Sequence, residues 1–195
     1  MKRLILSITF LFLLNQGFSQ LDFFSRGKKK AKFHDYKGAI VEYDKALELY
    51  PDSADIIFYK ANAKYNLNEF IGALLDYNKA IIRNPKFVEA YISRGNTRNN
   101  LQDFEAAIAD YSVAISLDSK NAIAYFYRAN IEVLQKNYKA AIADFTKAIE
   151  LDPNNSEAYI NRGNARNSIN DVDGACSDWN KASKMLGKQI IGNGK

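Results

Sequence analysis

The chain is poor in the residues that most enzyme chemistry needs. Its 195 residues include one cysteine, Cys176, and one histidine, His34. A single cysteine excludes an internal disulfide, and a lone histidine in a turn, as expected for His34, is more often a surface residue than a catalyst. The sequence has no Ser–His–Asp set, no metal-ligand cluster and no phosphate-binding loop. It therefore predicts no enzyme activity, no metal or other cofactor, and no small-molecule substrate.

An apolar run long enough to cross a bilayer, roughly 20 residues, is also missing. The N-terminal run from Leu4 to Leu14 is shorter, follows Lys2 and Arg3, and leads to two small residues, Gly17 and Ser19, on either side of Phe18. This order is typical of a secretory signal peptide. We therefore expect cleavage after Ser19 and export to the periplasm or the extracellular space, with an uncleaved membrane anchor as the alternative.

A strong excess of positive charge is missing as well. The net charge is +5, with 27 basic and 22 acidic residues, and removal of Lys2 and Arg3 leaves 25 against 22, or +3. That excess is too small to predict nucleic-acid binding. A local basic cluster, Lys28, Lys29, Lys30 and Lys32, is interpreted as a solvated end face, with contact to an acidic partner as the alternative.

What the chain does contain is repetition. The stretch "YISRGNTRNN" from Tyr91 returns 68 residues later as "YINRGNARNS" from Tyr159, and "YFYRANIEVL" from Tyr125 lies halfway between them. The same phase continues upstream, so the period is 34 residues. Five repeats start at Gln20, Ala54, Val88, Ala122 and Ser156.

Several columns of the repeat keep one residue type. Small residues stand at Gly27, Ala61, Gly95, Ala129 and Gly163. Alanine stands at Ala39, Ala73, Ala107, Ala141 and Ala175, and again at Ala46, Ala80, Ala114, Ala148 and Ala182. Aromatic residues stand at Tyr43, Tyr77, Tyr111, Phe145 and Trp179. Proline ends three repeats, at Pro51, Pro85 and Pro153.

This pattern resembles the tetratricopeptide repeat family, from Gln20 to about Leu186. The resemblance implies an all-α, right-handed superhelical solenoid of five helix-turn-helix repeats whose first helices line the concave side. We expect a signal peptide at 1–19, a repeat domain at 20–187 (20–53, 54–87, 88–121, 122–155 and 156–187), and a short C-terminal tail at 188–195.

Within a repeat, the apolar residues follow a helical period. In the third repeat they predict helices over Val88–Leu101 and Phe104–Leu117, joined by a turn at Gln102 and Asp103. Cys176 occupies a column otherwise filled by Ile40, Leu74, Ile108 and Ile142, so we expect a buried, structural cysteine.

Two charged columns accompany the apolar ones. Basic residues stand at Arg26, Lys60, Arg94, Arg128 and Arg162, and acidic residues stand sixteen positions later at Glu42, Asp76, Asp110, Asp144 and Asp178. Arginine can bind a carboxylate with two parallel hydrogen bonds. We interpret the columns as an ion-pair ladder between helices. The alternative is that the arginines face the groove and bind an acidic ligand.

An asparagine column completes the repeat: Asn62, Asn96, Asn130 and Asn164. The resemblance implies that these amides line the concave groove, where donor and acceptor together can bind an extended peptide backbone. The neighbouring groove positions are Phe58, Tyr59, Tyr65, Asn66, Asn99, Asn100, Phe126, Tyr127 and Asn167. The alternative is that the amides bridge the packing between helices.

These observations predict an exported scaffold or adaptor that binds a peptide segment or protein partner in its concave groove. The alternative is a structural or assembly component of an envelope complex that docks through its convex face or its C-terminal end. Self-association through that end is a further possibility, because an uncapped solenoid end is sticky.

Overall fold

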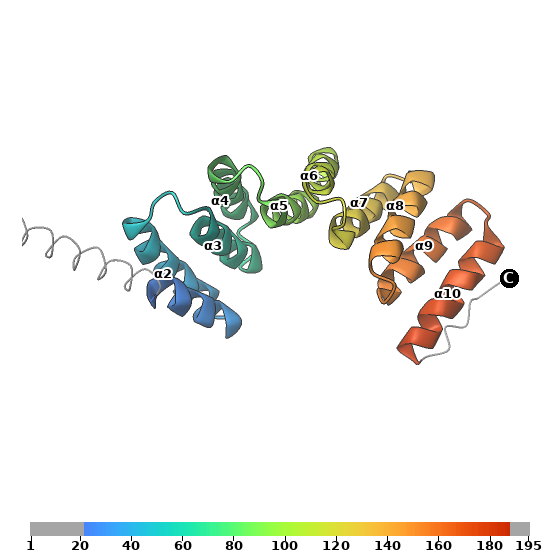
Figure 1. Ribbon diagram of the computed structural model, residues 1–195, viewed down its shortest axis with the longest axis horizontal. Coiled ribbons are helices and arrows are strands. Elements are labelled where there is room, and N and C mark those ends of the chain that lie inside the picture. Colours follow the sequence, from blue (N-terminus) through green and yellow to red (C-terminus); the bar gives the residue numbers. More distant parts are fainter. Residues whose placement is uncertain (1–21, 188–195) are drawn as a thin grey trace, which may run out of the picture. The chain divides into compact units, whose positions relative to one another are not determined.

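The computed structural model describes residues 22–187, and every regular element in this range is an α-helix (Figure 1). A helix over residues 22–32 comes first. It is followed by α2 (Tyr36–Leu49), α3 (Ala54–Asn66), α4 (Phe70–Arg83), α5 (Val88–Asn100), α6 (Phe104–Leu117), α7 (Ala122–Leu134), α8 (Tyr138–Leu151), α9 (Ser156–Ser168) and α10 (Val172–Leu186). The expected signal peptide and C-terminal tail lie outside the described residues.

The helices keep the period of the sequence. First helices begin at Ala54, Val88, Ala122 and Ser156, and each is followed by a second helix after a short turn. The predicted helix over Phe104–Leu117 has the observed bounds, and the one predicted over Val88–Leu101 ends one residue earlier. An all-α fold built of helix-turn-helix repeats is therefore confirmed.

The turn inside each repeat is marked by one residue with a left-handed backbone. These residues, with φ between 60° and 63°, are His34, Asn68, Gln102, Lys136 and Asn170. The predicted turn at Gln102 is confirmed, and so is the place of His34, whose Nδ1 lies 2.8 Å from the Tyr36 hydroxyl. In every repeat the residue after the left-handed one donates its backbone N–H to the carbonyl five residues earlier, as Glu69 does to Lys64, so a helix C-cap hydrogen bond stabilises the reversal.

Side-chain caps fix where several helices start. Asp35 and Asp171 accept hydrogen bonds from Gly38 N and Gly174 N at the second helices of the first and last repeats. Ser53, Asn121 and Asn155 do the same for first helices. Such caps satisfy backbone donors that the helix itself leaves without partners.

The small and aromatic columns form the core. All ten alanines of the two alanine columns are at most 1% exposed, and so are Tyr43, Tyr77, Tyr111 and Phe145. Small residues let the two helices of a repeat approach closely: a Cβ added at Gly163 would lie 2.6 Å from Trp179 Nε1. Close helix contacts and large aromatic side chains thus define each repeat.

The chain divides into two compact halves, Met1–Thr97 and Arg98–Lys195. In the first half, one core cluster surrounds Phe58 and Tyr77, and another surrounds Tyr43 and Ile56. In the second half, the cluster around Phe126 and Phe145 reaches Ala158, so it joins α7, α8 and α9. Each half therefore has a core of its own.

The prediction that Cys176 is buried is wrong, because its side chain is exposed. The equivalent residues of the other repeats, such as Ile40 and Ile142, are half-buried. No further repeat follows α10 within residues 22–187, so this face of the last second helix lacks the neighbour that covers it elsewhere. Within the same range, no helix is both long enough and apolar enough to cross a membrane.

Candidate partner-binding groove

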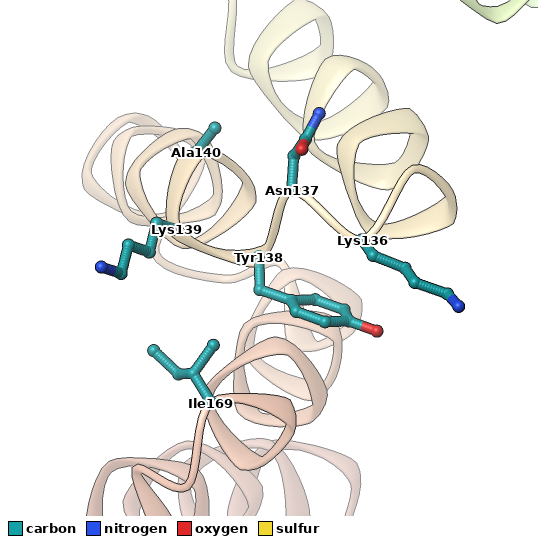
Figure 2. A pocket seen from close by; sticks show the side chains of 6 residues that line it. All are labelled: Lys136, Asn137, Tyr138, Lys139, Ala140 and Ile169. Carbon is teal, nitrogen blue, oxygen red and sulfur yellow. The ribbon is translucent and has the colours of Figure 1, made fainter.

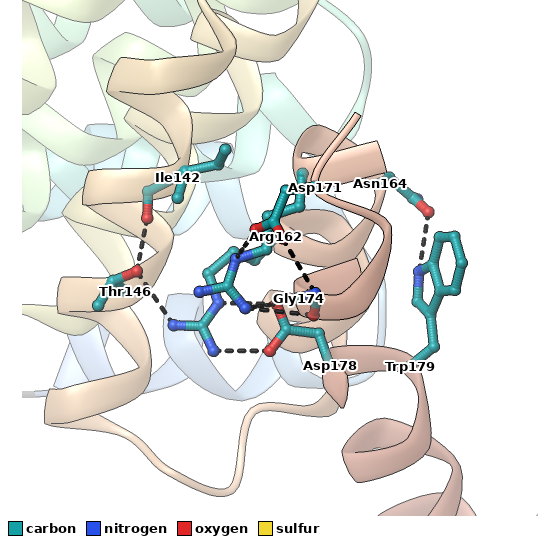
Figure 3. Close-up of polar contacts among 9 residues, drawn as sticks. Ile142, Thr146, Arg162, Asn164, Asp171, Gly174, Asp178 and Trp179 are labelled. Atoms are coloured by element: carbon teal, nitrogen blue, oxygen red, sulfur yellow. Dashed lines mark hydrogen bonds and ion pairs between the residues drawn. The ribbon is translucent and has the colours of Figure 1, made fainter. Parts of the chain in front are cut away.

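Two residues of the asparagine column accept hydrogen bonds from the second helix of their own repeat. The Tyr77 hydroxyl donates to Asn62 Oδ1. In the last repeat, Trp179 Nε1 donates to Asn164 Oδ1 at 3.1 Å (Figure 3). In both repeats an aromatic residue of the second helix thus binds the asparagine of the first, and these two amides bridge the packing as the alternative interpretation expected.

The fourth repeat differs because its aromatic residue is Phe145, which has no hydroxyl. Here Asn130 Oδ1 accepts a hydrogen bond from Asn161 Nδ2 at 2.9 Å, which links α7 to α9. These two asparagines, with Val133, Leu134 and Asn164, line a hollow of about 250 Å³. Leu134 is 59% exposed. The hollow therefore offers amide groups beside an accessible apolar side chain.

A smaller hollow of about 130 Å³ lies in the first half, lined by Asn62, Tyr65, Tyr77, Ser93 and Asn96. Burial raises the pKa of the Tyr77 hydroxyl, so that it remains a neutral donor. The structure therefore brings three predicted groove residues, Asn62, Tyr65 and Asn96, to one place.

The first repeat has Lys28 in the asparagine column. Its ammonium nitrogen lies 4.5 Å from the centre of the Phe24 ring and 5.8 Å from that of Tyr59. The buried Tyr43 hydroxyl has no hydrogen-bond partner, and burial raises its pKa to about 12. Lys28 belongs to the cluster interpreted as a solvated end face, with contact to an acidic partner as the alternative; it is exposed, and its ammonium group also interacts with these aromatic rings.

Two predicted groove residues belong to the core instead. Phe58 is 9% exposed and Phe126 is 8% exposed, and their rings pack on Phe87 and Phe145 with centroids 4.7 and 5.9 Å apart. The prediction that they line the groove is wrong, because each points between helices. The other positions are accessible to different degrees: Tyr59, Asn66, Asn100 and Asn167 are exposed, and Asn99 and Tyr127 are partly buried.

The charged columns form ion pairs inside repeats. Arg128 binds Asp144 through Nε and Nη2 at 2.6 and 2.9 Å, Arg162 binds Asp178 at 2.9 and 2.7 Å, and Arg26 binds Glu42 at 3.0 Å. The remaining nitrogen, Nη1, of Arg162 donates to the Thr146 hydroxyl of the preceding second helix at 3.0 Å (Figure 3). The ladder interpretation holds in these three repeats, where the basic residues hold helices together.

Lys60 departs from the ladder, and the sequence prediction missed a second column of basic residues. Lys60 pairs with Asp44 of the preceding repeat, while Lys64 binds Asp76 at 2.6 Å. The position four residues after the first basic column also supplies the pairs Arg98–Asp110 at 2.9 Å and Arg166–Asp178 at 2.8 Å. The sequence signal was the recurrence of Lys or Arg at this second position.

A further hollow, of about 450 Å³, lies beside the turn between α7 and α8 (Figure 2). Tyr138 and Ile169 line it, while the amines of Lys136 and Lys139 point to opposite sides. Its polar groups do not converge, and residues 22–187 contain no group of three or more metal-ligating side chains. Turn positions vary between repeats, so column reasoning could not find this hollow.

Known proteins resemble the chain in sequence family and in fold. Three family models, each described as tetratricopeptide repeat, match residues 58–122, 122–155 and 145–177 and together span more than half of the chain. A crystal structure of MamA protein is 23% identical, covers 92% of this chain and 98% of its own, and has a TM-score of 0.77.

Two further solved structures share the fold. YrrB, described as a TPR protein with an unusual peptide-binding site, is 18% identical, covers 86% of this chain and 87% of its own, and has a TM-score of 0.71. PilF of Pseudomonas aeruginosa is 17% identical, covers 90% and 80%, and has a TM-score of 0.81. A search of curated proteins finds no match. At these identities, structural likeness shows the fold alone.

Proposed function

We propose that this chain, which belongs to the tetratricopeptide repeat family, is a non-catalytic scaffold that holds an extended peptide segment of a partner protein in its groove. Members of the family are protein-binding scaffolds and are typically not catalysts. The observation that carries the proposal is the hollow between α7 and α9, where Asn130, Asn161 and Leu134 lie together.

The chemistry of this hollow suits a peptide. An amide side chain both donates and accepts, so it can pair with a peptide backbone of any sequence. Leu134 and Val133 add an apolar wall for one side chain of the segment. The peptide-binding site named for YrrB belongs to that protein, and its occurrence on the same fold supports the proposal. We also propose that the chain is exported, with 20–195 as the mature form.

We expect that Leu134→Lys weakens peptide binding about tenfold or more, which corresponds to about 1.4 kcal/mol. The probe is a fluorescent peptide selected on residues 20–195 from a library of short random peptides, and the measurement is its dissociation constant by anisotropy. Ile123→Lys is the matched control, because Ile123 lies on the same helix, is 57% exposed and does not line the hollow. Equal affinity of both variants and the wild type would refute groove binding.

A specific surface favours the alternative, docking through second helices. On α4, Ile71, Leu75 and Ile82 are 62%, 58% and 69% exposed, and at about 100° per residue they lie within about 40° of one another around the helix axis. We call them the α4 stripe. The other repeats carry polar residues at the two outer positions: Lys37, Glu105, Lys139 and Asp173, and Glu48, Ser116, Glu150 and Lys184. Only the second repeat therefore presents an apolar stripe there.

The occupant that fits this stripe is a partner protein with an apolar segment flanked by acidic residues. Lys79 on the same helix and Lys86 three residues after its end are exposed, and Lys79 is only loosely paired, with Nζ 3.6 Å from Asp76 Oδ1. Opposite charges at the rim of an apolar contact steer association. A purely apolar or basic partner would leave these ammonium groups without counter-charges.

The substitutions Ile71→Lys and Ile82→Glu test the stripe, because the chain itself carries these residues at the equivalent positions of other repeats. If the stripe docks a partner, a protein captured from the native envelope by residues 20–195 is lost with this double variant, is kept with Leu134→Lys, and binds more weakly as salt rises. A captured protein that is kept with the double variant and lost with Leu134→Lys binds in the groove. That result would refute docking at the α4 stripe.

A further inference from the structure

The fourth repeat carries a charge reversal. Four repeats have a base four residues after the first basic column: Lys30, Lys64, Arg98 and Arg166. In three of them this base contacts the acidic residue of its own repeat. The fourth repeat has Glu132 there instead, so a carboxyl group occupies the place of a cation.

The surroundings of Glu132 offer it no cation of its own. Its Oε2 is buried without a hydrogen-bond partner. Both oxygens of Asp144, on α8, are already bound by Arg128, whose third nitrogen donates to Ser112 of α6 at 2.9 Å. From α9, Arg162 is engaged by Asp178 and Thr146. Two carboxyl groups therefore share one guanidinium.

We propose that Glu132 is a proton-controlled latch between α7 and α8: the protonated side chain packs there as a neutral group, and ionisation places a second negative charge beside Asp144 and loosens the helix pair. Because Oε2 is buried and has no hydrogen-bond partner, protonation neutralises the carboxyl group without bringing a further cation between the helices.

The direction of the pH dependence follows from the two states. Burial, and then the charge of Asp144, raise the pKa of Glu132 to about 7 from 4.5, against an opposing effect of Arg128. The folded chain thus holds this proton more tightly than the unfolded chain does. The stabilisation of the folded chain by this proton is complete below about pH 4.5, is lost as the pH rises through about 7, and is absent above it.

The test compares the wild type with Glu132→Gln, which mimics the protonated form, and with Glu132→Arg, which restores the base found in the third and fifth repeats. We expect the thermal midpoints of wild type and Glu132→Gln to agree at pH 5, and the wild type to melt several degrees lower at pH 8. Glu132→Arg should also melt above the wild type at pH 8, because it gives Asp144 a second cation.

A local measurement separates the latch from a general effect of charge. Amide hydrogen exchange, corrected for the intrinsic rate, should show α7 and α8 about tenfold less protected in the wild type than in Glu132→Gln at pH 8, with no difference at pH 5. The control is Glu150→Gln, because the Glu150 side chain is 58% exposed. A difference between wild type and Glu132→Gln that is the same at both pH values would overturn the proposal.

Discussion

Replacing Asp178 by alanine is expected to lower the free energy of unfolding by about 3–5 kcal/mol. Asp178 is 3% exposed and binds Arg162 through both of its oxygens (Figure 3). It also binds Arg166 through Oδ2. Arg162 is itself only 11% exposed at its side chain. The substitution therefore leaves a buried guanidinium without its counter-charge. The measurement is urea unfolding followed by the fluorescence of Trp179, the single tryptophan, which lies in the same helix.

The matched control is Asp173→Ala, since Asp173 is exposed in the first turn of α10. Its carboxylate interacts favourably with the helix N-terminus, an effect of about 0.3–1 kcal/mol. If the two substitutions lowered stability equally, the ladder would be a surface feature, and the arginines would again be candidates for binding an acidic ligand.

The sequence predicted the helices well because the period fixes their phase. Once the five copies are aligned, a column that holds alanine in every repeat marks a close contact between helices in every repeat. The bounds of α6 follow from the apolar pattern alone. The same alignment predicted the pairs Arg128–Asp144 and Arg162–Asp178. These features depend on the contacts that every repeat shares.

The errors arose where one repeat differs from the others or where adjacent side chains compete. Phe126 and Tyr127 are neighbouring aromatic residues, and composition alone does not tell which of them turns inward. Asn130 lacks the aromatic donor that Asn62 and Asn164 have, because position 145 is phenylalanine. Cys176 lies in the last described repeat. Within residues 22–187, no following repeat covers the helix face on which it lies. Alignment averages over such differences, so only the packed structure exposes them.

Replacing Phe145 by alanine is expected to lower the free energy of unfolding by about 3–5 kcal/mol. The ring is fully buried and packs on Phe126 within the cluster that joins α7, α8 and α9. Its removal leaves a cavity that the flanking alanines are too small to fill. The measurement is thermal and urea unfolding followed by far-ultraviolet circular dichroism. Phe145→Tyr is the control, because tyrosine occupies this column in the first three repeats.

The same substitution tests whether neighbouring repeats unfold together. Trp179 lies in the fifth repeat, and Phe145 lies in the fourth, whose cluster includes Ala158 of α9. In a stacked array each repeat is stabilised by the interface with its neighbour, so damage at Phe145 also weakens the support of α9 and α10. The Trp179 transition of Phe145→Ala should therefore move to lower urea together with the helical signal. A tryptophan transition that stayed in place would mean that the fifth repeat is stable without the fourth.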